Sequence, residues 1–141
     1  MERELLKNIP RKLNKPNIDK AISDYLEFLS ELPLIIQSND ILEFLTKLKR
    51  QKLDCGPYPK VTLFEAGNRI MTDLVILFGI KELLDNKVPE LNFTEYTVEF
   101  GNENNNENDI WASNKDEILI GEAFNVAQSF FQSKKFKSLK K

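Results

Sequence analysis

The spacing of apolar residues changes once along this 141-residue chain, near residue 90. Before that point they recur every three or four positions, as in Ile18, Ile22 and Tyr25, which is the spacing of an amphipathic helix. After it they alternate with polar residues, as in "FTEYTVEFG", where Tyr96 and Val98 share one face. Helical segments followed by strands predict an α+β domain, α/β-like in its mixture of elements.

The elements follow in order along the chain. We expect helices over 17–32, 39–52 and 61–84, strands over 93–101, 109–113 and 117–126, and a C-terminal helix from about 127. A strand within the apolar run "DLVILFGI" is the alternative for part of the third helix. The first sixteen residues, with two prolines, predict an arm or a loosely packed helix. We therefore expect a helical N-terminal region, 1–60, and an α-βββ-α core, 61–141, within one compact domain.

Composition excludes several kinds of chemistry. The chain has no histidine, which rules out histidine acid–base catalysis, Ser-His-Asp and Cys-His pairs and histidine-bearing zinc sites. Its one cysteine allows no internal disulfide and predicts a reducing, cytoplasmic environment. No apolar run is long enough to span a membrane, and "MERELLKNIP" lacks the apolar segment of a signal peptide. Catalysis would therefore depend on carboxylates, lysines and oxygen-bound metals such as Mg²⁺.

Charge is unevenly distributed near the C-terminus. Residues 85–122 are rich in acids, whereas 123–141 carry lysines and no acid. An acidic region beside a basic one suits a cation site next to an anionic ligand. The alternative is a solvated acidic hairpin followed by a solvated helix end.

Two acids occupy notable places in the predicted strands. Asp109 begins the second strand, and Glu122 lies within the third, between apolar neighbours. A buried carboxylate needs a cation, a proton or hydrogen-bond donors, so we expect the two carboxylates to lie within about 5 Å of each other and share a cation. The simpler alternatives are turn chemistry for Asp109 and an exposed edge position for Glu122.

This arrangement resembles the PD-(D/E)xK nuclease superfamily, which includes many type II restriction endonucleases. "ND" at Asn108-Asp109 stands in the place of the family's Pro-Asp, and "GEAFN" puts Glu122 in the place of its second acid. Glu65 lies on the preceding helix, where many members keep an additional acid, although Glu65 and Arg69 also suit a simple helical ion pair. The resemblance covers roughly residues 61–141 and implies a restriction-endonuclease-like core. The family has a further strand after the C-terminal helix, so either the chain is a fragment or the sheet is completed otherwise.

The resemblance also implies an activity. A member of this family would be a metal-dependent DNA endonuclease, with Asp109, Glu122 and Glu65 as ligands of Mg²⁺ or Mn²⁺. Phe124 stands where the family has its lysine, and a lysine of the following helix would then take that role, Lys134 before Lys135. DNA is the expected partner, contacted by Lys134, Lys135 and Lys137, with a homodimer as a further expectation.

Two other functions compete with this one. The first is a nuclease fold that has lost catalysis and binds nucleic acid or a protein partner. The second is an unrelated helical interaction domain. Plasmid cleavage in the presence of Mg²⁺ separates the endonuclease from both.

Overall fold

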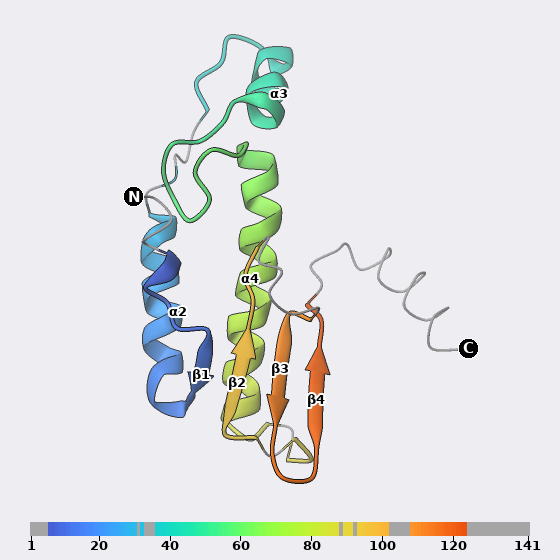
Figure 1. Ribbon diagram of the computed structural model, residues 1–141. Coiled ribbons are helices and arrows are strands. Elements are labelled where there is room, and N and C mark those ends of the chain that lie inside the picture. Colours follow the sequence, from blue (N-terminus) through green and yellow to red (C-terminus); the bar gives the residue numbers. More distant parts are fainter. Residues whose placement is uncertain are drawn as a thin grey trace, which may run out of the picture.

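The computed structural model describes residues 6–30, 32, 36–87, 89–91, 93–101 and 108–123. Within these residues the chain forms three helices and a four-stranded antiparallel sheet (Figure 1), which confirms the predicted α+β class. The elements are β1 (Lys12–Asn14), α2 (Lys15–Leu29), α3 (Ile41–Arg50), α4 (Leu63–Leu84), β2 (Glu95–Val98), β3 (Ile110–Ser113) and β4 (Ile118–Gly121).

The sheet has the strand order β1-β2-β3-β4, and each neighbouring pair is antiparallel. The predicted three-stranded meander corresponds to β2, β3 and β4, so the strand count was one short. The missing strand, β1, lies in the segment expected to be an arm or a loose helix, and its Leu13 is fully buried. Three residues are too few to show a periodicity, and the pairing of Lys12 with Thr97 is what makes this segment a strand.

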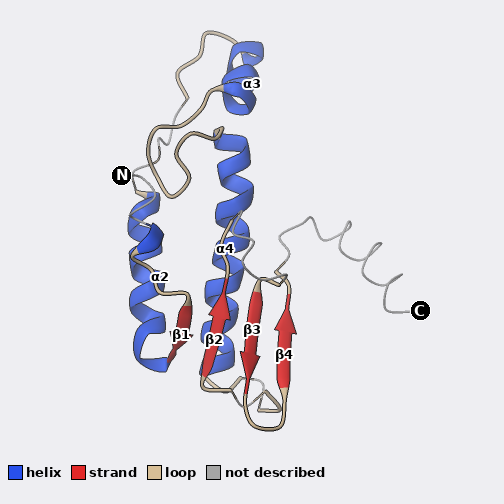
Figure 2. Cartoon of the chain, in the orientation of Figure 1, coloured by secondary structure: helices blue, strands red, loops and turns tan. Residues whose placement is uncertain are grey.

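Helices α2 and α4 run in opposite directions, side by side, behind the sheet (Figure 2). An ion pair of 2.8 Å between Lys81 of α4 and Asp19 of α2 joins the end of one helix to the start of the other. Both helices bury one face in the same apolar core as the inward-facing strand residues. That core is centred on Ile18, Tyr25, Ile76, Leu77, Ile80, Leu13, Tyr96 and Val98.

The helix boundaries follow local capping. Helix α2 begins earlier than Asn17, which we expected to be its N-cap. Asn14 takes that place, and the two asparagines exchange side-chain to backbone hydrogen bonds of 2.9 and 3.1 Å. Thr62 caps α4, which continues to Leu84 and excludes the alternative of a strand in its second half.

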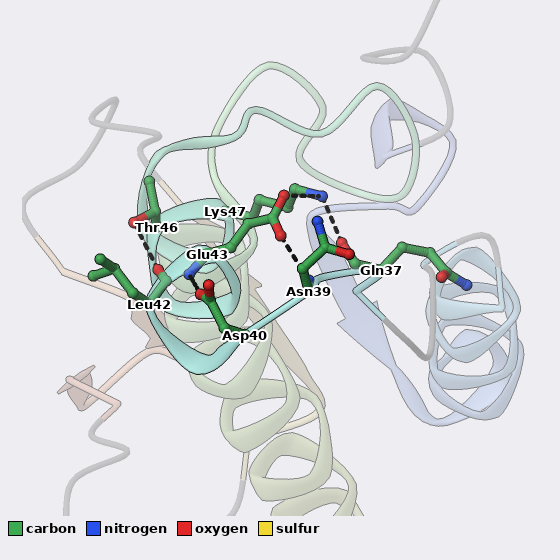
Figure 3. Close-up of polar contacts among 7 residues, drawn as sticks. All are labelled: Gln37, Asn39, Asp40, Leu42, Glu43, Thr46 and Lys47. Atoms are coloured by element: carbon green, nitrogen blue, oxygen red, sulfur yellow. Dashed lines mark hydrogen bonds and ion pairs between the residues drawn. The ribbon is translucent and has the colours of Figure 1, made fainter.

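Helix α3 is stabilised more by hydrogen bonds at its N-terminus than by burial of its side chains. Asp40 accepts a hydrogen bond from the backbone of Glu43, and Glu43 accepts one of 2.6 Å from the backbone of Asn39 (Figure 3). This backbone donor, with a smaller effect from nearby Lys47, lowers the pKa of Glu43. No residue of α3 is fully buried, and Leu42 is 72% exposed.

Three further expectations concern the C-terminal part. Strand β4 ends at Gly121, so Glu122 follows the strand instead of lying inside it. Trp111, which we interpreted as a core residue, is 40% exposed on the outer face of the sheet because the β3 register turns Ala112 inward. The expected C-terminal helix lies outside the described residues.

Candidate functional site

The two acids that we expected to form a site lie at the same end of the sheet. Ile110 pairs with Gly121 across β3 and β4, so Asp109 and Glu122 are the next positions on the two strands. Their environments differ from the expected ones. Glu122 is exposed and needs no buried cation to compensate it. Asp109 is half-buried, and its carboxylate accepts a hydrogen bond of 2.9 Å from the backbone of Ala123.

The remaining predicted site residues do not add to this pair. Glu65 lies in the first turn of α4 and forms an ion pair with Arg69, as in the simpler interpretation. Lys134, Lys135 and Lys137 lie outside the described residues. Across the part of the chain that is described, no group of three or more Asp, Glu, Cys or His side chains is arranged to hold a metal ion. The three-acid ligand set is therefore not assembled among these residues.

A different carboxylate is buried. Asp73, in the middle of α4, is fully buried and accepts hydrogen bonds from the hydroxyl groups of Tyr25 and Tyr58, the first at 2.5 Å. Its other oxygen accepts a bond of 3.1 Å from the backbone of Gly101. Asp73 therefore ties together α2, the loop before α4, α4 itself and the chain that follows β2.

Close packing at this junction explains why residue 101 is a glycine. Gly101 has a φ of +56°, and a Cβ built there would lie 2.5 Å from the Tyr58 hydroxyl. A side chain is therefore excluded by contact as well as by backbone conformation. The junction fixes the ring of Tyr58, which forms one wall of a pocket at the surface.

This pocket has a volume of about 490 Å³ and lies between the N-terminal segment, the loop before α4, and α4. Four of the described residues that line it are basic, and none is acidic. The basic residues are Lys7, Arg11, Lys60 and Arg69, and the aromatic ones are Tyr58 and Phe100. A concave surface lined by cations attracts an anionic group.

The two arginines of the pocket are held in place by the protein. Arg11 donates to the carbonyl groups of Leu6 and Ile9 at 3.1 and 2.6 Å, and its guanidinium lies 4.7 Å from the centre of the Phe100 ring. Arg69 is paired with Glu65 and lies over the ring of Tyr58. Their positions are therefore fixed, although the charge of Arg69 is partly offset.

The two lysines differ from the arginines. Lys7 and Lys60 are exposed, and neither forms an ion pair or a side-chain hydrogen bond with another described residue. Lys60 has a φ of +76° at the end of a tight loop, where its backbone donates to Leu53 at 2.7 Å. This bond and the one from Leu53 to Val61 close the loop, so Lys60 has a fixed place at the pocket rim.

The pocket and the pair of acids are close along the chain. Phe100 lines the pocket, and the backbone of the preceding residue, Glu99, donates a hydrogen bond of 3.0 Å to the carbonyl of Asp109. One residue of the pocket lining, Phe100, therefore lies one position beyond the residue of the chain after β2 that bonds to Asp109.

The sequence analysis predicted neither the Asp73 junction nor the basic pocket beside it. The sequence does carry one indication of the junction: Asp73 follows Ala66 and Ile70 at helical spacing, which places an acid on the buried face of an apolar helix. The lysines gave no signal, since Lys7 and Lys60 are far apart in the sequence.

Comparisons with known proteins add no identification: no family model matches the sequence, and no match was found among curated proteins or among solved structures. None of the described helices combines the length and the apolar character needed to cross a bilayer.

Proposed function

We propose that this protein binds the phosphate backbone of nucleic acid, and that the phosphates contact the basic pocket. The observation that carries this proposal is the pocket lining, in which two fixed arginines and two exposed lysines surround a concave surface. Arginine and lysine contacts to phosphates supply most of the sequence-independent affinity of nucleic-acid-binding proteins.

The basic surface extends beyond the pocket, which favours a polyanion over a single phosphate. The last turn of α3 carries Lys47, Lys49 and Arg50. The next lysine, Lys52, forms a β-bridge with Thr62 at the base of the loop that carries Lys60. Cations therefore continue from the end of α3 to the pocket rim, as expected for a surface that follows several phosphates.

Reversing the two exposed pocket charges tests the proposal. We expect Lys7→Glu/Lys60→Glu to weaken binding to a labelled mixed-sequence DNA duplex by about ten- to a hundredfold, because two charge-assisted contacts are lost. Fluorescence anisotropy at fixed low salt measures this change. Both side chains are exposed, so circular dichroism should show an unchanged fold.

A matched pair controls for net charge. Lys15 and Lys115 are also exposed, but Lys15 follows β1 and Lys115 lies in the β3–β4 turn, at the opposite end of the sheet from the pocket. Lys15→Glu/Lys115→Glu changes net charge by the same amount. Equal loss of affinity in the two variants would mean that the pocket is not the binding site.

A second candidate is a Mg²⁺-dependent endonuclease, as the family resemblance implies. The observation in its favour is that Asp109 and Glu122 occupy neighbouring positions at the same end of β3 and β4. Mg²⁺ often takes only one or two carboxylates and completes its ligand set with water and substrate phosphate. Two acids are therefore compatible with such a site, although no third acid among the described residues is assembled with them.

Plasmid cleavage tests this second candidate separately from binding. We expect supercoiled plasmid to be nicked in Mg²⁺ or Mn²⁺ and not in EDTA, and Asp109→Ala or Glu122→Ala to remove the activity while DNA binding persists. Asp116→Ala, in the β3–β4 turn, is the control for loss of an exposed acid. Binding without metal-dependent cleavage would leave a non-catalytic nucleic-acid-binding module.

A further inference from the structure

Helix α4 carries a line of exposed side chains that the described residues leave largely uncovered. The exception is at Phe64, where the Lys49 ammonium lies 4.5 Å from the centre of the ring. Phe64, Met71, Val75 and Phe78 are 39–47% exposed, which is high for large apolar residues. Asn68 and Glu82 are exposed on the same helix.

The spacing of these exposed residues is typical of a helix that packs along a second helix. Its members alternate steps of four and three residues along α4, in the order Phe64, Asn68, Met71, Val75, Phe78 and Glu82. On a helix these positions lie within about 40° of one line and span about 27 Å. In heptad terms Met71 is a d position and Val75 an a position, which is the pattern of a two-stranded coiled coil.

Two glycines flank the line. Gly67 lies on one side of it and Gly79 on the other, and a Cβ at either position would meet no atom within 4 Å. A glycine inside a helix costs about 1 kcal/mol relative to alanine. Packing among the described residues therefore gives no reason for either glycine, whereas a second helix lying along the line could use the space.

We propose that α4 pairs with α4 of a second copy of this chain, in parallel, about a twofold axis along this line. In a parallel pair each a or d residue faces its own copy, so apolar side chains meet apolar ones and the Asn68 amides can hydrogen-bond to each other. A single asparagine at an a position is a known device for fixing this register. No charged residue lies on the line between Phe64 and Phe78.

The flanking positions fit the same arrangement. In a parallel pair a g residue lies beside the e residue five positions later on the partner. Leu74, which is half-buried, then lies against Gly79 of the second copy, and Gly67 lies against Thr72. An antiparallel pair would instead place Asn68 against Phe78 with no hydrogen-bond partner.

Light scattering over a concentration series tests the pairing with the full chain. We expect a dimer for the unmodified protein and a monomer for Val75→Glu or Phe78→Glu, with a dissociation constant raised about a hundredfold or more, because each substitution buries a charge twice. Ile120→Glu is the matched control: Ile120 is 59% exposed on the outer face of the sheet, and its substitution should leave the dimer intact.

Cross-linking tests the direction. In a Cys55→Ser background, Asn68→Cys should form an intermolecular disulfide on oxidation, because a parallel pair places the two copies of this residue together. An unmodified protein that is monomeric at every concentration, or a dimer that survives Val75→Glu and Phe78→Glu, would overturn the pairing. A dimer that fails to cross-link through Asn68→Cys would overturn the parallel direction.

Discussion

Asp73→Ala is expected to lower the free energy of unfolding by about 3–5 kcal/mol, the largest effect of any single substitution considered. The carboxylate accepts hydrogen bonds from Tyr25, Tyr58 and the backbone of Gly101. Alanine would leave both hydroxyl groups buried without this acceptor, and each such loss costs about 1–3 kcal/mol. It would also release the Tyr58 wall of the pocket.

Urea unfolding measures this change. Asp73→Asn keeps the shape of the side chain and one acceptor oxygen, so its loss should be smaller than that of the alanine variant. Asp24→Ala is the surface control, because Asp24 forms an exposed helical ion pair with Lys20, worth about 0.3–0.5 kcal/mol. A loss below about 1 kcal/mol for Asp73→Ala would contradict the role given to this junction.

Stability is expected to fall steeply at alkaline pH because of Tyr25. Burial, and then the negative charge of Asp73, raise the pKa of the Tyr25 hydroxyl far above its ordinary value of 10.0. The folded state therefore holds this proton more tightly than the unfolded state does. The resulting stabilisation is complete below about pH 10 and is lost as the pH rises above it, at about 1.4 kcal/mol per pH unit for one proton.

Tyr25→Phe separates this effect from the titration of lysines. The variant should be less stable than the unmodified protein near neutral pH, and its stability should fall less steeply above about pH 10. Tyr96→Phe is the comparison at neutral pH: the Tyr96 hydroxyl is buried and has no hydrogen-bond partner among the described residues, so its removal should cost little or nothing. Equal alkaline slopes for Tyr25→Phe and the unmodified protein would contradict the account.

The sequence predicts the main elements because their patterns are long. Helix α4 spans 22 residues with strong apolar character, and β2 shows clear alternation between Tyr96 and Val98. The spacing of apolar residues predicts nothing where a tertiary contact decides the secondary structure. Strand β1 is only three residues long and exists because β2 pairs with it.

The sequence analysis expected a buried carboxylate at Glu122, whereas the structure buries Asp73. Glu122 stands between apolar residues in the sequence, but β4 ends before it and leaves it exposed. Asp73 occupies an equally apolar stretch and is fully buried, because the face of α4 that carries it packs against α2 and the sheet. Alternation and helical spacing show which residues share one face of a strand or helix. Which face is buried depends on the neighbouring elements that pack against it.

The basic pocket was not predictable from local patterns at all. Its lysines come from positions 7 and 60, and its aromatic walls from Tyr58 and Phe100. The junction at Asp73 joins the Tyr58 loop to the chain after β2, and the pairing of β1 with β2 brings in the N-terminal segment.

The salt dependence of DNA binding tests the central proposal most directly. Each phosphate contact that is lost should flatten the plot of log K against log salt concentration by about 0.9 on duplex DNA. For Lys7→Ala/Lys60→Ala we therefore expect a slope about 1.8 less steep than that of the unmodified protein, and for Lys15→Ala/Lys115→Ala an unchanged slope. A Lys7→Ala/Lys60→Ala protein with the slope of the unmodified chain would show that phosphates do not contact this pocket.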